Sequence, residues 1–338
     1  MVTIKDVASR AGVAPMTVSR VINQPEAVAL RTRSRVQAAI DELHYVPNKL
    51  GQGLLGRSTM MIALVVNDIT NPFAIKQVRG VTQAARRHGF TVVFAHSYGR
   101  PAEEMRELRA LIERRVDGII LAPVRNTPDA VDFVQGTGTP IVVMDYRMPH
   151  NEVDTVRCDT RAAAATLTRN LLELGHRRIA MLTGPRDIVT AADRATGYEE
   201  TMASFGLSPR TIWGSYEVKS GEEMAHAVLS GPNRPTALVT AGNNISLGAA
   251  RAARQVGLVI PEDISIVTFD DAQSDTVLDP FFTGAVQPIS EMAETAALFL
   301  FDRISHAYDG PPRDRVLDVA FSNYRSAGPL STQSLADD

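Results

Sequence analysis

The chain has 338 residues, of which 44% are hydrophobic and 22% charged, a composition typical of a globular protein long enough for two or three domains. No run approaches the roughly 18 apolar residues of a membrane span, and the first residues lack an apolar signal segment. A single cysteine excludes a framework of disulfides within the chain. We therefore expect a cytoplasmic protein. The net charge of −3 divides into +4 for residues 1–57 and −7 for the rest, which suits a nucleic-acid-binding head as well as a merely solvated helix face.

Three short helices are predicted at the start of the chain. The first spans residues 3–12, with Thr3 as its N-cap and Gly12 at its end. The second begins at Pro15, and the third runs from about Arg31 to Leu43. A tight, glycine-containing turn between the first two helices is typical of a helix-turn-helix unit.

From Met60 onward, apolar runs alternate with amphipathic segments. The runs predicted as strands are "MIALVV", "TVVFA", "DGIILAP", "PIVVMD", "RRIAMLTG", "TALVTA" and "ISIVTFD". The segments predicted as helices include 74–88, 101–115, 160–174, 192–206 and 244–256. This alternation predicts an α/β body with two doubly wound parallel-sheet subdomains rather than one barrel.

Residues 51–56, "GQGLLG", match the dinucleotide fingerprint G-x-G-x-x-G, and Asp68 follows near the place of an acidic ribose partner. The fingerprint requires a strand before it and a helix that opens at it. Pro47 breaks any preceding strand, and only three residues separate Gly56 from the next predicted strand, too few for a crossover helix. We therefore expect no nucleotide site here and no cofactor.

The segment "TIKDVASRAGVAPMTVSRVIN" closely resembles the DNA-binding headpiece of the LacI/GalR repressor family, and "LRTRSRVQAAIDELHYVPN" continues the likeness. Further matching motifs are "NDITNPFA", "LLELGHRRIAMLTGP", "DRATGY" and "GLVIPEDISIVTFDD". The resemblance implies a helix-turn-helix head, a hinge and a two-lobed body like a periplasmic sugar-binding protein. It implies a dimeric transcription regulator that is controlled by a small molecule.

The same resemblance divides the chain into a headpiece (1–46), a hinge (47–59) and an effector-binding and dimerisation domain (60–338). Within that domain, the expected N-subdomain covers about 60–158 and 289–320, and the C-subdomain covers about 159–288 and 321–338.

The second helix is expected to enter the major groove of DNA with its first turns. Ser, Thr, Asn and Arg side chains supply the usual phosphate and base contacts, although an ordinary solvent face would also explain Thr17 and Ser19. Met16 offers no strong donor, so it is expected to touch base edges or thymine methyl groups. Ala14 stands where the family usually has a serine cap. The predicted DNA-binding residues are Thr3, Pro15, Met16, Thr17, Ser19, Arg20, Asn23, Thr32, Tyr45, Asn48 and Leu54.

In the family, the segment after "PN" folds into a hinge helix in the minor groove, and the leucine that wedges into a base step maps to Leu54. Here Gly51-Gln52 replaces the usual Ala-Arg, and each helical glycine costs roughly 1 kcal/mol relative to alanine. We hypothesise that the hinge is unfolded away from DNA and that its folding is coupled to operator binding.

Ligands of open α/β lobes bind at the carboxyl ends of strands. Asp145 and Asp270 end two predicted strands, and Arg194 matches the arginine that binds effectors in the family. A structural role stays open for each residue alone, for example an ion pair between Arg194 and Asp193 or Glu199. Taken together, carboxylates and an arginine read hydroxyl groups while aromatic rings cover sugar or base faces. The predicted effector-binding residues are Phe73, Asp145, Thr190, Arg194, Tyr216, Asn243 and Asp270.

The ligand class stays open at this stage. Gly242-Asn243 stand where the family usually has Asn-Asp, so an amide replaces a carboxylate. This change is compatible with a sugar, a sugar-like metabolite or a nucleoside.

We therefore predict a transcriptional repressor, homodimeric on a pseudo-palindromic operator in double-stranded DNA, that a small molecule releases. A regulator of the same family that needs a corepressor or a partner protein is the main alternative. A solute-binding protein would have a signal peptide and no basic head. An enzyme would need a nucleophile, an acid–base pair or a phosphate loop, and none has suitable spacing; the seven histidines show no metal spacing. No leucine heptads follow the body, so a tail-built tetramer is not expected.

Overall fold

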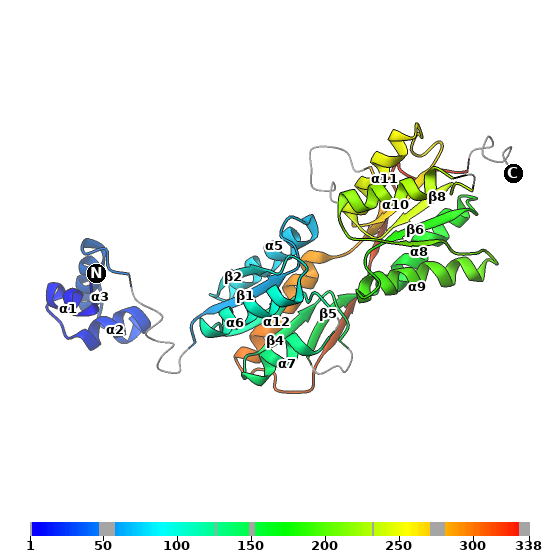
Figure 1. Ribbon diagram of the computed structural model, residues 1–338. Helices are drawn as coiled ribbons and strands as arrows, with labels where there is room; N and C mark the ends of the chain where they lie inside the picture. Colours follow the sequence, from blue (N-terminus) through cyan, green and yellow to red (C-terminus); the bar gives the residue numbers. More distant parts are fainter. Residues whose placement is uncertain are drawn as a thin grey trace. The chain divides into compact units, whose positions relative to one another are not determined.

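The computed structural model describes residues 2–46, 58–125, 127–148, 153–231, 233–270 and 281–330. The chain forms two compact units, Met1–Thr59 and Met60–Asp338. The first unit, the headpiece, is blue in Figure 1, and the second, the body, runs from cyan to red. Each is described by itself.

The headpiece contains the three predicted helices, α1 (Ile4–Ala11), α2 (Pro15–Asn23) and α3 (Leu30–Glu42), with a short 3₁₀ turn at Pro25–Ala27. Thr3 caps α1 reciprocally: its hydroxyl accepts from the amide of Asp6, whose carboxylate accepts from the amide of Thr3 at 2.8 Å. Gly12 ends α1 in the left-handed region, with φ 63°. The helix-turn-helix prediction is therefore confirmed.

One valine from each helix forms the centre of the headpiece core. Val7, Val18 and Val36 are completely buried. The guanidinium group of Arg35, on α3, donates to the carbonyls of Ala11, the last residue of α1, and of Gly12, which opens the turn to α2. These bonds hold α3 against the turn and fix the angle at which α2 is presented.

The first turn of α2 has no side-chain cap, because Ala14 occupies the N-cap position. We expect Ala14→Ser to stabilise the headpiece by about 1 kcal/mol, since its hydroxyl can accept from a free amide of that turn. Hydrogen exchange of the α2 amides in the full chain should slow about fivefold. Ala14→Val, which offers no acceptor and is as poor an N-cap residue as alanine, is the control and should change protection little; equal protection in the serine variant and wild type would contradict the prediction.

The described part of the body forms two six-stranded sheets, which define a first and a second lobe, and each is covered by helices on both faces (Figure 1). The first sheet has the order β11-β5-β4-β3-β1-β2 and the second β12-β10-β9-β8-β6-β7. All pairings are parallel except that of β10 with β12. The predicted α/β body with two parallel-sheet subdomains is confirmed.

The elements of the first lobe are β1 (Met61–Val66), α5 (Pro72–Arg87), β2 (Thr91–His96), α6 (Pro101–Glu113), β3 (Gly118–Leu121), α7 (Asp129–Gly136), β4 (Ile141–Met144), β5 (Asp154–Cys158), α12 (Ile289–Ile304) and β11 (Asp314–Leu317). Those of the second lobe are α8 (Thr160–Glu173), β6 (Ile179–Thr183), α9 (Val189–Ser204), β7 (Thr211–Trp213), α10 (Val218–Leu229), β8 (Ala237–Thr240), α11 (Asn243–Gln255), β9 (Ser265–Phe269), β10 (Thr283–Val286) and β12 (Ala320–Ser322).

Over the described residues, the chain passes between the two lobes three times: after β5, between β10 and α12, and between β11 and β12. Each passage leaves the carboxyl end of a parallel strand. The carboxyl edges of the two sheets therefore face the same junction, which is where ligands bind in folds of this kind.

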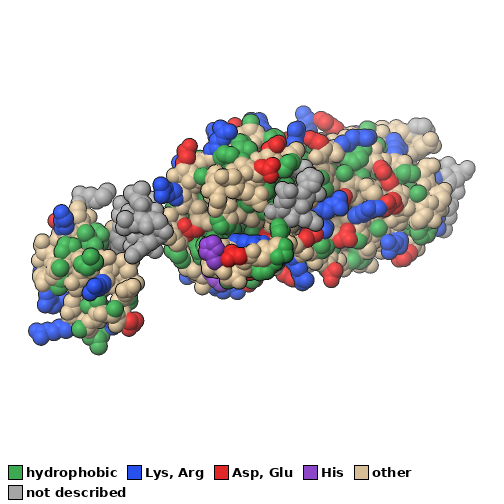
Figure 2. Space-filling view, turned by 90° about the horizontal axis from the view of Figure 1, so that it is seen from below, with side chains coloured by type: hydrophobic (Ala, Val, Ile, Leu, Met, Phe, Trp, Pro, Cys, Tyr) green, Lys and Arg blue, Asp and Glu red, His purple; other side chains and the backbone are tan. Residues whose placement is uncertain are grey.

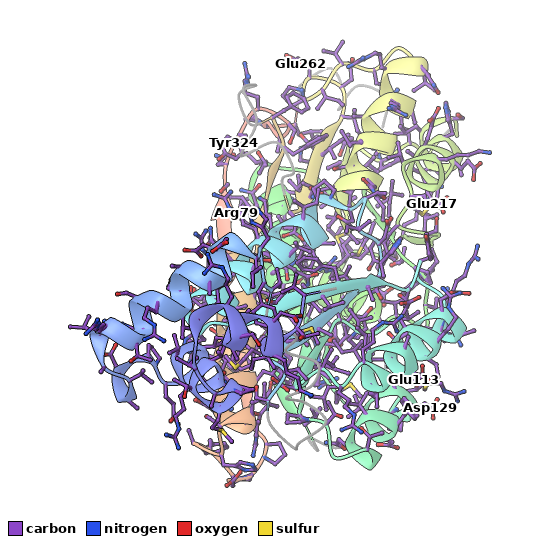
Figure 3. All side chains as sticks on the ribbon, turned by 90° about the vertical axis from the view of Figure 1, so that its left-hand side faces the viewer. Arg79, Glu113, Asp129, Glu217, Glu262 and Tyr324 are labelled. Carbon is purple, nitrogen blue, oxygen red and sulfur yellow. The ribbon has the colours of Figure 1, made fainter. Side chains whose placement is uncertain are left out.

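The sheets form the core because their central strands are covered on both sides. Five of the six residues of β1 are buried, as a strand in the middle of a parallel sheet requires. Helices α5 and α12 approach so closely that a Cβ atom on Gly80 would lie 2.6 Å from the Cβ of Ala293. Charged side chains such as Glu113 and Asp129 project from the outer surface of the first lobe (Figure 3).

A buried histidine joins three segments at the amino edge of the second sheet. The Nδ1 atom of His176 lies 2.9 Å from the Thr236 hydroxyl, and its Nε2 atom lies 3.1 Å from both the Ser265 hydroxyl and the Gly328 carbonyl. Burial lowers the pKa of His176 below its usual 6.5, although the Gly328 carbonyl opposes the shift.

Because unfolding restores the ordinary pKa of His176, the unfolded chain binds a proton more readily than the folded chain. We expect this contribution to stability to be complete above pH 6.5 and to be lost as the pH falls from 6.5 through the lowered pKa. Urea unfolding between pH 8 and 5 measures the effect, and His176→Gln should reduce the slope of unfolding free energy against pH. An unchanged slope in that variant would contradict the assignment.

Candidate ligand cleft and DNA-binding surface

Helix α2 presents a polar and apolar surface that DNA could contact. Pro15, Met16, Arg20 and Asn23 are exposed, and 66% of the surface of Met16 is accessible. Figure 2 shows hydrophobic and basic side chains on the surface of the headpiece. The Asn23 amide donates to the Ser19 carbonyl at 2.9 Å and to the Ser19 hydroxyl at 3.3 Å, and the second bond holds the two side chains together.

The other predicted DNA contacts have different surroundings. Thr17, Ser19, Thr32 and Tyr45 are half-buried, and exposed Thr3 forms the α1 capping bonds. Asn48 and Leu54 lie outside the described residues, as does the whole segment 47–57.

The predicted effector residues come from both lobes. Phe73 is in the first turn of α5 and Asp145 directly follows β4, so these two belong to the first lobe. The other five belong to the second lobe and lie on or next to α9, α10, α11 and β9: Thr190, Arg194, Tyr216, Asn243 and Asp270.

Arg194 lies at the centre of this group. It is only 6% exposed, donates to the Ala241 carbonyl at 2.7 Å, and places its guanidinium carbon 4.2 Å from the ring centroid of Phe269. Within the described parts of the chain, no ion pair joins Arg194 to Asp193 or Glu199, the alternative raised by the sequence; Glu199 accepts from the Thr211 hydroxyl instead. In the same parts of the chain, the Nε atom of Arg194 has no hydrogen-bond partner. Its charge acts instead on Asp145 and Asp270.

Both carboxyl groups are held in buried surroundings. Burial raises the pKa of Asp145 to about 7; Arg194 opposes the rise and Asp270 adds to it. Burial also raises the pKa of Asp270, although Arg194 and the hydrogen bonds from Gln287 oppose this. Each aspartate has a left-handed backbone, with φ of 70° and 55°, and such strained positions cluster at functional sites.

Tyr216 fits beside a strand end that has no side chain. A Cβ atom on Gly184 would lie 2.3 Å from the Tyr216 ring, so glycine is required there. The hydroxyl of Tyr216 is buried, and Thr190 lies close enough to influence its pKa, which burial raises. Thr190 and Tyr216, predicted separately, are therefore neighbours.

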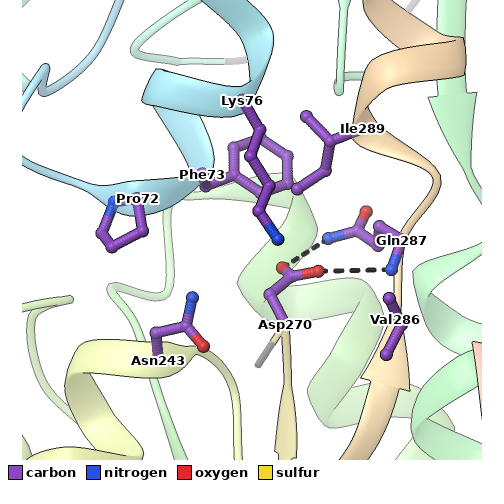
Figure 4. Close-up of a pocket in the computed structure, with 8 residues that line it drawn as sticks. All are labelled: Pro72, Phe73, Lys76, Asn243, Asp270, Val286, Gln287 and Ile289. Atoms are coloured by element: carbon purple, nitrogen blue, oxygen red, sulfur yellow. Dashed lines mark hydrogen bonds between the residues drawn. The ribbon is translucent and has the colours of Figure 1, made fainter. Parts of the chain in front are cut away.

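A cavity of about 10 Å³ lies between the two lobes, which is room for roughly one water molecule (Figure 4). Its lining includes the predicted residues Phe73, Asn243 and Asp270. It also includes residues that the sequence did not indicate, namely Pro72, Lys76, Val286, Gln287 and Ile289. Gln287 directly follows β10, whose sequence is "TGAV", in a passage between the lobes. A polar residue directly after this short run was the signal by which the sequence could have indicated Gln287.

Among the described residues near this junction, four buried polar atoms have no hydrogen-bond partner: Asp145 Oδ1, Arg194 Nε, Tyr216 Oη and Gln287 Oε1. Such atoms are rare in folded proteins because each costs free energy. A molecule with both hydroxyl donors and acceptors would satisfy them. Among the described residues there is no cluster that could hold a metal ion and no helix long and apolar enough to cross a membrane.

Comparison with known proteins agrees with this geometry. Residues 59–322 match the family described as periplasmic binding proteins and sugar binding domain of LacI family, and residues 3–48 match bacterial regulatory proteins, lacI family. The HTH-type transcriptional repressor PurR of Pectobacterium atrosepticum is 32% identical, with 96% of this chain and 100% of that protein covered. The ribose operon repressor of Escherichia coli is 33% identical, with coverage of 90% and 94%.

Solved structures extend the likeness to the whole chain. The transcriptional regulator CelR–cellobiose complex is 31% identical, with a TM-score of 0.73 and coverage of 96% of this chain and 100% of that one. The lac repressor dimer bound to operator and the anti-inducer ONPF is 26% identical, with a TM-score of 0.86 and coverage of 98% and 99%. Proteins of this family bind operator DNA and small-molecule effectors and act as dimers. The chain therefore belongs to the LacI family of bacterial regulatory proteins, and it is a DNA-binding transcriptional repressor rather than an enzyme.

Proposed function

We propose that this repressor acts in the cytoplasm on a pseudo-palindromic operator and that a hydroxyl-bearing ring compound, a sugar, sugar-like metabolite or nucleoside, binds between the lobes. The observation that carries the proposal is the set of four unpartnered polar atoms on Asp145, Arg194, Tyr216 and Gln287. Two acceptors, one donor and one hydroxyl suit a ligand whose hydroxyl groups both donate and accept.

The relatives support a carbohydrate ligand. A solved LacI-family regulator from Enterococcus faecium contains bound ribose, and the CelR structure contains cellobiose. In this chain, the small cavity requires the lobes to separate before such a molecule enters. Closure onto the ligand would then connect its binding to the arrangement of the body.

We further propose that Met16, Thr17 and Arg20 read base edges in the major groove, with Leu54 as the minor-groove wedge. The exposure of Met16 and Arg20 on α2 supports the first part.

A two-step experiment tests the proposal. Genomic fragments selected by the full chain identify the operator, and a thermal-shift screen of sugars and nucleosides identifies the ligand. Operator affinity is then measured with and without that ligand. A fall in affinity supports release by an inducer, a rise supports a corepressor, and no change would contradict control through the cleft.

A further inference from the structure

A short loop of the second lobe reaches across to the first lobe. The loop joins β6 to α9, and its last residue, Ile188, is the N-cap of α9. Ile188 is half-buried and packs against an apolar cluster that includes Val65, Leu108 and Tyr146. Every buried member of that cluster belongs to the first lobe. Ile188 therefore forms an apolar contact between the lobes.

An ion pair lies beside this contact. Arg125 follows β3 in the first lobe, and its Nη2 atom is 3.2 Å from the Oδ2 atom of Asp187, the neighbour of Ile188. The residue before Arg125 is fixed, because the Val124 amide donates to the Glu104 carboxylate at 2.7 Å. Both charged side chains are more than half exposed, so the pair is screened by water and adds less than the apolar contact does.

The loop is held firmly to its own lobe. The Ile188 amide donates to the Pro185 carbonyl at 3.1 Å, which closes a tight turn. The guanidinium carbon of Arg186 lies 4.7 Å from the ring centroid of Trp213, next to the end of β7. The loop therefore moves with the second lobe, and its contacts with the first lobe break when the lobes separate.

We propose that Ile188 and the Arg125–Asp187 pair form a latch, which keeps the two lobes together in the ligand-free protein and must open before a ligand enters. The cavity between the lobes has room for roughly one water molecule, so a ring compound enters only after the lobes have separated. The role in ligand entry rests on the proposed ligand cleft. The closing of the lobes by the latch does not depend on any ligand.

Cys158 can report the opening of the lobes. It is the single cysteine of the chain and the last residue of β5, directly before a passage into the second lobe. It is 5% exposed, and its thiol lies close enough to Asp145 and Asp270 for both to influence its pKa, which burial raises. A buried thiol of this kind is inert, so a thiol reagent should reach it when the lobes separate.

Modification of Cys158 by N-ethylmaleimide in the ligand-free full chain tests the latch. Ile188→Ala should raise the modification rate about tenfold, because the rate follows the population of the open form and the truncated side chain loses its contact with the first lobe. Ile212→Ala is the matched control, since Ile212 is a half-buried isoleucine of β7 that packs against the core of its own lobe. It should leave the rate near that of the wild type. Equal rates in the two variants would overturn the inference.

A charge exchange tests the ion pair separately and removes little packing. Arg125→Asp places two acids opposite each other and should raise the modification rate about threefold at low ionic strength. Adding Asp187→Arg restores opposite charges and should return the rate toward that of the wild type. If the double variant reacts as fast as Arg125→Asp alone, the pair is not part of the latch and the inference is wrong in that part.

Ligand kinetics separate the latch from the proposed function. D-ribose, D-glucose and adenosine are the probes, and any of them that binds should associate about tenfold faster with Ile188→Ala than with the wild type, because opening precedes entry. Equal association rates would overturn the role of the latch in ligand entry. If no sugar or nucleoside binds either protein, the proposed function fails, whereas the ligand-free modification rates still decide whether the latch exists.

Discussion

Arg194→Met is expected to weaken ligand binding by about 100-fold or more while leaving operator affinity in the absence of ligand unchanged. The guanidinium group is the buried cation on which Asp145 and Asp270 both depend. Methionine fills much of the same space but carries no charge and no donor. Losing one charge-assisted bond to a ligand costs about 3 kcal/mol, which corresponds to a factor of more than 100.

The expected phenotype of this variant is a repressor that no longer responds to its ligand. Titration calorimetry with the ligand from the screen measures affinity, and operator binding measured in parallel reports whether the head still works. Arg194→Lys is the matched control, because it keeps a positive charge but loses the planar guanidinium group. Its ligand affinity should lie between those of the wild type and of Arg194→Met.

The bond from Arg194 to the Ala241 carbonyl is also lost, so the unfolding temperature of each variant must be compared. If Arg194→Met binds ligand as the wild type does, the cleft is in the wrong place. If it loses operator binding as well, the arginine is structural and the proposed role is wrong.

The parts of the fold that the sequence predicted are those with strong periodicity. All seven apolar runs correspond to strands, β1, β2, β3, β4, β6, β8 and β9, because central strands covered on both faces are apolar at every position. Strand β5 was not predicted, because "DTVRC" mixes polar and apolar residues and so lacks an apolar run. Its buried Asp154 is paired with two arginines that lie far away in the sequence, Arg303 and Arg313. The short strands β7, β10, β11 and β12 and helices α7, α10 and α12 were likewise not predicted.

The residues of the candidate cleft likewise divide into those that a strong sequence pattern indicates and those that it does not. Asp145 and Asp270 could be found because each directly follows a strongly apolar strand. Lys76 and Gln287 could not, because a lysine on an amphipathic helix and a glutamine in a connection have ordinary explanations. The passages of the chain between the lobes bring α5 opposite β9. They thereby place Lys76 and Gln287 in the lining of one cavity together with Asp270.

Asp154→Ala is expected to destabilise the body by about 3–5 kcal/mol, because it strips two arginines of a buried counter-charge. Asp154 is 2% exposed. Arg303 donates to it at 2.8 and 3.0 Å, and Arg313 donates from its side chain at 2.7 Å and from its amide at 2.8 Å. These bonds join the start of β5 to the end of α12 and the entry to β11.

Arg303 and Arg313 have few other partners that could replace the carboxylate of Asp154. The guanidinium carbon of Arg313 lies 3.7 Å from the ring centroid of Phe299, and Arg303 already donates to the Gly310 carbonyl at 2.8 Å. Both groups are therefore held in position and cannot turn toward water without disturbing their neighbours. Asp302 keeps one bond to Arg313 at 2.7 Å, but Arg303 has no second carboxylate among the described residues.

Asp314→Ala supplies the comparison, since Asp314 forms a two-bond pair with Arg157 at 2.7 and 3.0 Å on the same sheet but is more exposed. Its loss should cost no more than about 1 kcal/mol. Urea unfolding of both variants at pH 7 measures the difference. Similar losses for the two would mean that burial of Asp154 adds nothing and that the prediction is wrong.

The pH dependence of the Asp154 contribution gives a second, independent measurement. Burial alone would raise the pKa of Asp154, but the hydrogen bonds from Arg303 and Arg313 outweigh it and hold the pKa below its usual 3.8. A lowered pKa means that the carboxylate stabilises the fold fully above about pH 3.8 and loses that effect as the pH falls through the folded-state value. The difference in unfolding free energy between wild type and Asp154→Ala should therefore be constant from pH 7 to 5 and should shrink only below that window. A difference that already shrinks between pH 7 and 5 would show that another titrating group holds the two arginines in place.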